Sequence, residues 1–170
     1  TMRFTPQRVT SDMFDARSRS SGFYETEFEL PVAPDVFWAE LHQERPQRWF
    51  SLARSTRWVS QRRDCTGATR EVTMAPGAGV HEEFFVWEKP DARMGRGQAA
   101  FSVTSATVPG IRRLGERITV SAAPGGCRVR WEFVVAVAAP AIMTRAAMPF
   151  IVGRLVRDTR AHFDQLNTPT

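Results

Sequence analysis

A regular alternation of apolar and polar residues is the feature of this sequence that most constrains its fold. In the segment FYETEFEL, at residues 23–30, a glutamate occupies every second position from Glu25 to Glu29. Successive side chains of a β-strand point to opposite faces, so this pattern predicts a strand with one buried face. Six further strands are predicted between turns rich in glycine and proline, at residues 56–61, 69–74, 80–87, 93–107, 114–121 and 128–137. The chain is therefore expected to form an antiparallel sheet of about seven strands.

Three segments have the spacing of helices instead. Two short helices are predicted directly after the first strand, at residues 34–43 and 46–53. A long helix is predicted from Pro140 to about Leu166, because apolar residues recur there at helical spacing. Pro149 is expected to kink this helix or to divide it from a short preceding segment. One long helix and one half-buried sheet predict an α+β helix-grip fold, in which the curved sheet wraps around the C-terminal helix.

The chain has the length of one domain, at 170 residues. Residues 1–21 are polar without a sustained apolar period and are expected to form a flexible arm, with a single domain at residues 22–167. The longest apolar run, at residues 133–143, is too short for a membrane span, so no integral membrane association is expected. The first residues lack a secretory signal pattern, which favours a cytoplasmic protein. Cys65 and Cys127 lack metal-ligand spacing and are expected to be free thiols.

The net charge of +5 is the one feature that points to nucleic acid. Nearly all of the positive charge is arginine, since Lys89 is the only lysine. The arginines are scattered along the chain, and none belongs to a motif interleaved with the aromatic residues on which RNA bases stack. We therefore expect a solvated basic surface and no nucleic-acid partner.

Five short motifs, in the order of the predicted elements, resemble those of one superfamily. They are LPVAPDVFW at 30–38, PQRWF at 46–50, GATR at 67–70, VWEKP at 86–90 and CRVRW at 127–131. Residues 22–167 thus resemble the START-like or SRPBCC superfamily, and within it the polyketide cyclase/dehydrase and lipid-transport family. One departure is that Pro46 precedes a single Trp49, where the family often has Trp-Pro-x-Trp. The resemblance implies a ligand cavity between the sheet and the C-terminal helix, but no particular chemistry.

The ligand-binding candidates are the side chains expected to face that cavity. They are Tyr24, Phe28, Met74, Phe84, Phe101, Val103, Glu116, Ile118, Trp131, Phe133, Val152 and Val156. Aromatic and methionine side chains suit the wall of a ligand pocket and an ordinary packed core alike, so both interpretations stay open here.

Four of the residues near this wall are the candidates for acid–base chemistry. They are Glu116, Glu82, His81 and Tyr24. Glu116 has the same phase as Ile118, and Glu82 the same phase as Phe84, so both carboxylates are expected on an apolar face. A carboxylate there must be paired, protonated or in contact with water or a ligand. The three histidines have no metal-ligand spacing, so no metal is expected.

Binding of a hydrophobic or amphipathic small molecule is the function that the pattern favours. The expected ligand is of the lipid, polyketide or isoprenoid type, and no cofactor is implied. Two alternatives remain at this stage: a polyketide aromatase/cyclase or dehydrase acting on a bound substrate, and a ligand-free stress or regulatory interaction module. Monomer and homodimer both stay open.

Overall fold

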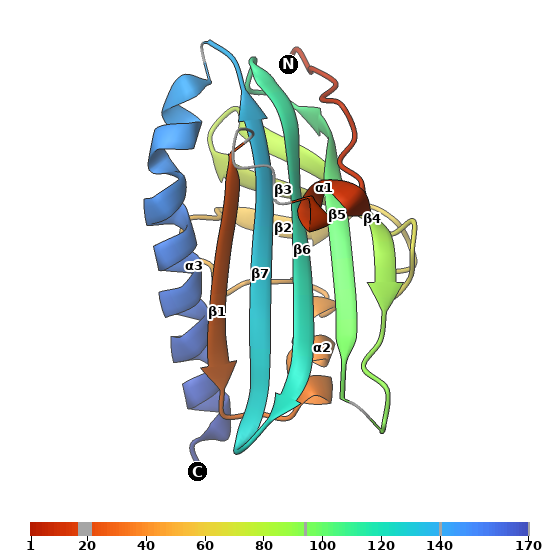
Figure 1. Cartoon of the computed structure of the whole chain (residues 1–170). Helices are drawn as coiled ribbons and strands as arrows, with labels where there is room; N and C mark the ends of the chain where they lie inside the picture. Colours follow the sequence, from red (N-terminus) through yellow and green to blue (C-terminus); the bar gives the residue numbers. More distant parts are fainter. Residues whose placement is uncertain (17–21, 94, 140, 170) are drawn as a thin grey trace.

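The computed structural model describes residues 1–16, 22–93, 95–139 and 141–169, and its main feature is a curved sheet beside a long helix (Figure 1). The seven strands lie in the order β1-β7-β6-β5-β4-β3-β2, and every neighbouring pair is antiparallel. They are β1 (Phe23–Leu30), β2 (Ser55–Trp58), β3 (Thr69–Ala75), β4 (Ala78–Glu88), β5 (Gly97–Ala106), β6 (Ile111–Ala123) and β7 (Gly126–Val137). The helices are α1 (Ser11–Asp15), α2 (Pro34–Leu41) and α3 (Ile142–Asn167). The prediction of an α+β helix-grip fold is confirmed.

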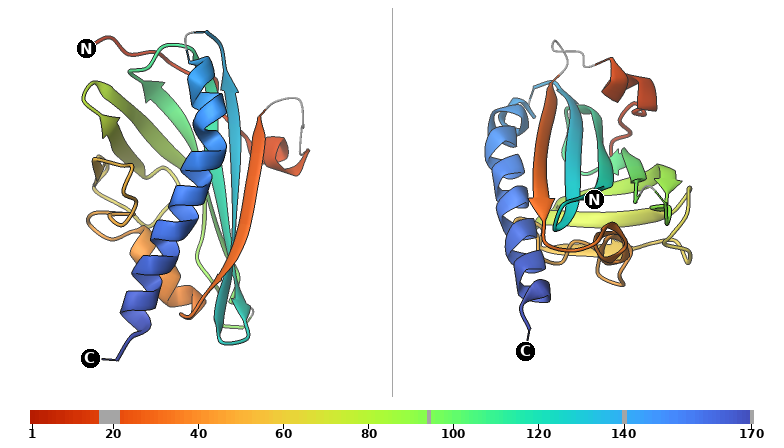
Figure 2. Two further views of the ribbon diagram at one scale, coloured as in Figure 1. Left: turned by 90° about the vertical axis from the view of Figure 1, so that its left-hand side faces the viewer. Right: turned by 60° about the horizontal axis from the view of Figure 1, so that its bottom comes forward.

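β-Bulges bend the sheet. The pairing register shifts between Thr73 and Ala75 on β3, at two places on β4, and between Ile111 and Arg113 on β6. An extra residue in one strand of a pair kinks that strand and increases its twist. The sheet therefore curls into a concave face, which α3 and α2 cover, and a convex face, which carries the N-terminal arm (Figure 2).

The main core lies between the concave face and α3. The helix turns Met148, Leu155, Thr159 and Phe163 inward at helical spacing, and Phe163 is fully buried, as is Trp131 of β7. Full burial of large apolar side chains stabilises a fold by about 1.5–3 kcal/mol each. The buried side chains of α3 are therefore part of the main core, and the sheet needs this helix to cover its concave face.

Pro149 does not divide α3, which runs without interruption from Ile142 to Asn167. Proline has no N–H, so the carbonyl four residues earlier, that of Arg145, loses its usual helical partner. The hydroxyl of Tyr24 on β1 donates to the Arg145 carbonyl oxygen at 3.2 Å. A side chain of the sheet thus compensates the carbonyl that the proline leaves free.

The second short helix predicted at residues 46–53 is wrong, because this segment forms a series of turns. Gln47 has a φ of 53°, in the left-handed region, which a right-handed helix cannot contain. The hydrogen bonds that follow span only three residues, from the Phe50 N–H to the Gln47 carbonyl and from the Ala53 N–H to the Phe50 carbonyl. We call residues 44–54, which lead from α2 to β2, the α2–β2 loop.

The expectation of a flexible arm is wrong for residues 1–16, which pack on the convex face. Phe4 pairs with Ala106 as an isolated β-bridge, and the Val9 N–H donates to the buried Ser102 hydroxyl at 2.9 Å. Phe14 is fully buried in a second apolar cluster on this face. The rest of the predicted arm, residues 17–21, lies outside the described residues.

Candidate functional site

One group of polar side chains lies on the concave face, within a wall that is otherwise apolar. We call it the concave polar cluster, and its members are Arg70 on β3, Glu82 on β4, Glu116 on β6 and Trp131 on β7. Arg70 is directly opposite Glu82 in the β3–β4 pairing, so the two side chains emerge on the same face. Strand alternation thus places one cation and two carboxyl groups on the same concave face.

Arg70 is the cation of the cluster, and it is only 2% exposed. Its Nε donates to the Glu82 carboxylate at 2.5 Å. Its guanidinium also lies 5.1 Å from the ring centre of Phe84 and 5.0 Å from that of Phe101. A delocalised guanidinium suits such a place because it stacks on aromatic faces while it binds a carboxylate. Burial raises the pKa of Glu82, while the charge and hydrogen bond of Arg70 oppose this rise.

Glu116 is the carboxyl group without a hydrogen-bonded cation among the described residues. It accepts a hydrogen bond from the Trp131 indole N–H at 2.9 Å. Desolvation raises its pKa to about 8, the charge of Glu82 adds to the rise, and the Trp131 bond and the Arg70 charge oppose it. The side chain as a whole is only half-buried, although protein surrounds its carboxyl group. At pH 7 this carboxyl is therefore mostly protonated and can donate a hydrogen bond or a proton.

Glu116 stands in the middle of an aromatic row that crosses the concave face. The strand registers pair Tyr24 with Phe133, Phe133 with Glu116, Glu116 with Phe101, and Phe101 with Phe84. The aromatic neighbours Phe133 and Phe101 are almost fully buried, whereas Glu116 between them keeps some exposure. Glu116 therefore retains some exposed surface between two neighbours that are closed off from solvent.

Several apolar side chains of the sheet and of α3 are also half-buried. Leu114 and Val137 on the sheet, and Ile151, Val152 and Val156 on α3, pack against the main core without being enclosed by it. Leu114 is two residues from Glu116, on the same face of β6. β6 therefore carries an incompletely buried apolar side chain on the same face as the Glu116 carboxyl group.

Most of the apolar residues predicted for the cavity wall do lie inside the fold. Those that are 3% exposed or less are Phe28, Phe84, Phe101, Val103, Ile118, Trp131 and Phe133. Tyr24, Val152 and Val156 are half-buried and pack against the same core. Met74 is the exception, with 37% of its surface exposed, because the register shift between Thr73 and Ala75 takes it out of the regular alternation. The prediction for Met74 is therefore wrong.

His81 lies on the convex face, away from the concave polar cluster. It is adjacent to Glu82 in the chain, so its side chain must point the opposite way. Its ring contacts the Glu71 carboxylate, which also binds Arg57 at 3.4 Å and Arg3 at 3.6 Å. The expectation that His81 lines the cavity is wrong. The ion pairs of Glu71 with His81 and Arg3 instead connect β3 with β4 and with the N-terminal arm.

Arg70 is the member of the cluster that strand phase alone could have identified. It is four residues from Met74, which was expected to face the cavity, so the same alternation puts Arg70 on the concave face. Its partner Glu82 was already expected there. Tyr24, the remaining acid–base candidate, has its hydroxyl bound to the Arg145 carbonyl.

The chain belongs to the family described as polyketide cyclase/dehydrase and lipid transport, whose pattern it matches over residues 24–168. An uncharacterised protein of Mycobacterium tuberculosis strain H37Rv is 29% identical over 143 residues, which are 80% of this chain and 81% of the relative. The sequence resemblance to the START-like superfamily is thus confirmed.

Solved structures show the same fold at low sequence identity. A START superfamily protein from Mycobacterium smegmatis has a TM-score of 0.65 at 10% identity, over 85% of this chain and 99% of that one. A major latex-like protein from Panax ginseng has a TM-score of 0.61 at 14% identity, over 84% of this chain and 97% of that one. These similarities establish the helix-grip architecture and carry no ligand across.

Two further properties of the described residues bear on the class of site. None of the helices there is long and apolar enough to cross a membrane. In the same part of the chain no group of three or more His, Cys, Asp or Glu side chains is placed to hold a metal ion.

Proposed function

We propose that this protein binds a hydrophobic or amphipathic small molecule of the lipid, polyketide or isoprenoid type between the concave face and α3. The observation that carries the proposal is Glu116, a half-buried carboxyl group with a pKa of about 8 in a row of aromatic side chains. Apolar binding sites characteristically combine such walls with a few polar groups that fix the orientation of the ligand.

In this proposal the two halves of the ligand meet different groups. A carbonyl or hydroxyl oxygen accepts a hydrogen bond from protonated Glu116, whose other oxygen the Trp131 indole N–H already holds. The apolar part lies against the half-buried side chains of α3, such as Val152 and Val156. The Arg70–Glu82 pair keeps its own charges matched and adds a fixed dipole beneath the site.

A neutral fluorescent probe, 1-aminoanthracene, tests this proposal. We expect it to bind the wild type and to be displaced by a long-chain alcohol. Val156→Trp fills the space beside α3 and is expected to weaken binding at least tenfold. The neighbouring Arg157 is exposed, so Arg157→Trp adds the same side chain outside the site and serves as the control. Absence of binding, or equal binding by both variants, would contradict the proposal.

Native mass spectrometry of the freshly purified protein complements the probe. A bound apolar molecule that is retained by Arg157→Trp and lost from Val156→Trp would support the proposal. Protein that carries no ligand and binds no probe would favour a ligand-free interaction module, the alternative left open above.

An acid–base enzyme of the cyclase or dehydrase type is a second candidate, and the pKa of Glu116 is the observation that favours it. A general acid works best when its pKa is near the working pH, and its loss costs about 10²–10⁴-fold in rate. Aromatisation of a synthetic poly-β-keto thioester, followed by absorbance, would test this. We expect Glu116→Gln to bind 1-aminoanthracene normally and to lose at least 100-fold in turnover. Equal turnover by the variant would contradict an acid–base role.

A further inference from the structure

Three uncharged connections meet at one end of the sheet, beside the start of α3 (upper end in Figure 1). They are the β3–β4 turn, the β5–β6 turn and the β7–α3 connection. We call the described part of this surface, residues 75–78, 107–110, 138–139 and 141–143, the apolar tip. The Thr107 N–H donates to the Gly79 carbonyl at 2.9 Å, and the Ala138 N–H donates to the Gly110 carbonyl at 2.8 Å. The three connections therefore form one continuous surface.

The first turns of α3 extend this apolar surface along the outside of the helix. Ile142, Met143 and Phe150 are 54%, 73% and 62% exposed. Met143 and Phe150 are seven residues apart and so lie on the same side of the helix, while Met148 and Leu155 are buried in the main core. A helix at the surface of a domain usually has a polar outer side. Large apolar side chains that gather on an exposed face are typical of an interaction site.

The margin of the apolar tip is positively charged. Arg112 follows the β5–β6 turn and Arg145 lies in the first turn of α3, and both are exposed. Neither has an ion-pair partner in the part of the chain that the structure describes. The chain contains no acidic residue at positions 102–115 or 133–157, so no carboxylate of these segments offsets the two arginines. A negatively charged surface would therefore be attracted to this end of the molecule.

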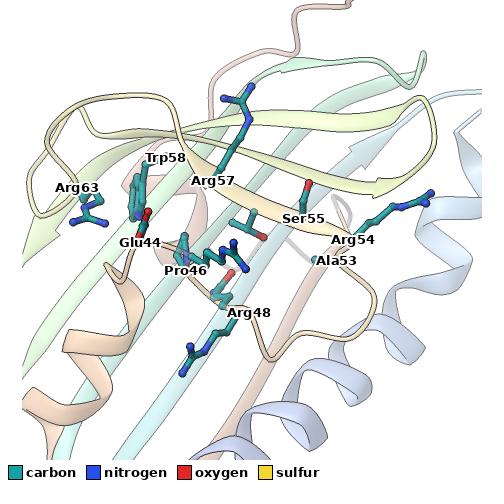
Figure 3. Close-up of a pocket in the computed structure, with 12 residues that line it drawn as sticks. Glu44, Pro46, Arg48, Ala53, Arg54, Ser55, Arg57, Trp58 and Arg63 are labelled. Atoms are coloured by element: carbon teal, nitrogen blue, oxygen red, sulfur yellow. The ribbon is translucent and has the colours of Figure 1, made fainter.

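Other parts of the surface are charged in a different way. The β4–β5 connection, at the opposite end of the sheet, contains both Lys89 and Asp91. Around the α2–β2 loop and β2, arginines such as Arg48, Arg54 and Arg63 extend in different directions (Figure 3). The combination of an uncharged tip and a basic margin is thus particular to the end of the sheet where α3 begins.

The connections of the apolar tip satisfy several of each other's backbone groups. The Thr107 hydroxyl donates to the Gly77 carbonyl at 2.6 Å and accepts from the Gly79 N–H at 2.8 Å. The Ala141 N–H donates to the Ala138 carbonyl at 2.7 Å. Backbone groups without partners are costly to move out of water. These groups are already paired, so the tip can enter a less polar environment without leaving them unsatisfied.

We infer that the apolar tip docks on the surface of a bilayer that contains anionic phospholipid. Ile142, Met143 and Phe150 enter the interface, and Arg112 and Arg145 lie beside the headgroup phosphates. Helices that bind membrane surfaces combine exposed apolar side chains with arginine or lysine in this way, and anionic lipids attract the cations. Contact between the tips of two copies would instead bring two positive margins together, which is unfavourable. The docking surface goes beyond the proposed function, and either can fail without the other.

Removal of the exposed apolar side chains provides the first test. We expect the wild type to cosediment with vesicles made of equal amounts of phosphatidylcholine and phosphatidylglycerol. Met143→Gln combined with Phe150→Gln keeps the net charge and suits a helix, and it should weaken this binding at least tenfold. Val36→Gln combined with Val59→Gln removes two exposed apolar side chains away from the tip and should leave binding unchanged. No binding by the wild type, or equal binding by the two double variants, would overturn the inference.

The basic margin is tested separately. We expect the wild type to bind vesicles of phosphatidylcholine alone more weakly than the mixed vesicles, and high salt to reduce this difference. Arg112→Gln combined with Arg145→Gln should reduce it in the same way. Arg62→Gln combined with Arg93→Gln removes the same charge from exposed arginines elsewhere and is the matched control. Equal losses in the two double variants would show a general attraction of a basic protein to anionic vesicles and would overturn the inference.

Two further measurements separate docking from its alternatives. Sedimentation velocity without lipid should show the same mass for the wild type and for Met143→Gln combined with Phe150→Gln. A dimer that this variant dissociates would assign the tip to a second copy and overturn the inference. The variant should bind 1-aminoanthracene normally and keep its melting temperature, because both side chains lie on the outer side of α3. A wild type that binds the probe but no vesicles would overturn the docking alone, whereas one that binds vesicles but no probe would contradict the proposed function alone.

Discussion

The two faces of the sheet treat a buried carboxylate in opposite ways. On the convex face, Glu132 is 1% exposed and accepts two hydrogen bonds from Arg117, from Nε at 2.6 Å and from Nη2 at 3.0 Å. On the concave face, Glu116 accepts one bond, from the neutral indole of Trp131. The strands β6 and β7 supply all four residues, so the difference arises from the face and not from the strands.

The covering of each face explains the contrast. The arm closes the convex face, where Phe14 lies 5.1 Å below the Arg117 guanidinium and Asp15 binds its Nη1 at 2.7 Å. Arg117, Glu132 and Asp15 thus form one ion-paired group on this face. On the concave face α3 covers the sheet but leaves Glu116 half-buried and without a cation of its own. This unpaired carboxyl group supports the proposal that the concave face binds a ligand.

Phe14→Ala should have the largest effect, because it tests whether the arm really closes the convex face. The ring is fully buried, and removal of a buried phenylalanine side chain costs about 3–5 kcal/mol. We expect a loss of about 4 kcal/mol in the free energy of unfolding, measured by urea denaturation. Met2 is 75% exposed, so Met2→Ala is the control on the same arm and should change stability by less than about 0.5 kcal/mol.

Glu132→Gln should come next, since it breaks the buried ion pair of the convex face. Removal of one partner of such a pair leaves the other uncompensated and costs about 3–5 kcal/mol. Asp15 still binds Arg117, so we expect the lower value, about 3 kcal/mol. Glu27→Gln, at an exposed carboxylate, should stay within about 0.5 kcal/mol. Equal denaturation curves for the two variants would show that the pair on the convex face is not a structural one.

Tyr24→Phe tests a neutral hydrogen bond of the concave side and should have a smaller effect. Loss of the bond to the Arg145 carbonyl is expected to cost about 1 kcal/mol. Pro149→Ala restores the N–H that this carbonyl lacks, so the cost of Tyr24→Phe should fall in that background. A double-mutant cycle measures this coupling. Additive effects would mean that Tyr24 does not compensate for the proline.

The positions of the strands, and the face on which each of their side chains lies, were the features that the sequence predicted best. Alternation identified all seven strands, although the fifth begins at Gly97 and not at residue 93. It also put Glu116 and Glu82 on the apolar face, because a period of two fixes the direction of every side chain once the register is known. The same rule failed at Met74, where a register shift interrupts the period.

Features that depend on distant contacts could not be predicted in this way. Val9 and Phe14 have no apolar neighbours at a regular spacing, so nothing local indicates that the arm packs on the sheet. The left-handed backbone at Gln47 is equally invisible, because glutamine has no preference for it. A pocket of about 590 Å³ brings together residues 44–48, 53–58 and Arg63, whereas in the sequence the arginines among them look scattered.

Glu116→Gln should change stability least in acid solution, below about pH 4.5, and should most clearly distinguish the two faces as the pH rises. The pKa of the folded group is raised from its ordinary value of 4.5 to about 8. Between these values the folded state holds a proton that the unfolded state has released, so stability falls as the pH rises through this window. Glutamine resembles the protonated form. We therefore expect the variant to equal the wild type below about pH 4.5 and to exceed it progressively towards pH 8 and above.

The pH dependence of stability should differ between Glu116→Gln and Glu132→Gln, and a comparison of the two variants tests the contrast between the faces. In urea denaturation between pH 5 and pH 9, the difference between Glu116→Gln and the wild type should grow by about 2–3 kcal/mol, a value that allows for screening at a half-buried group. Glu132→Gln should be destabilised over the same range, because its partner Arg117 stays charged throughout. If Glu116→Gln were destabilised like Glu132→Gln, Glu116 would be a structural ion-pair partner, and the concave face would be as complete as the convex one. If it is stabilised while it loses affinity for an oxygen-bearing ligand, the carboxyl is kept for binding at a cost to the fold.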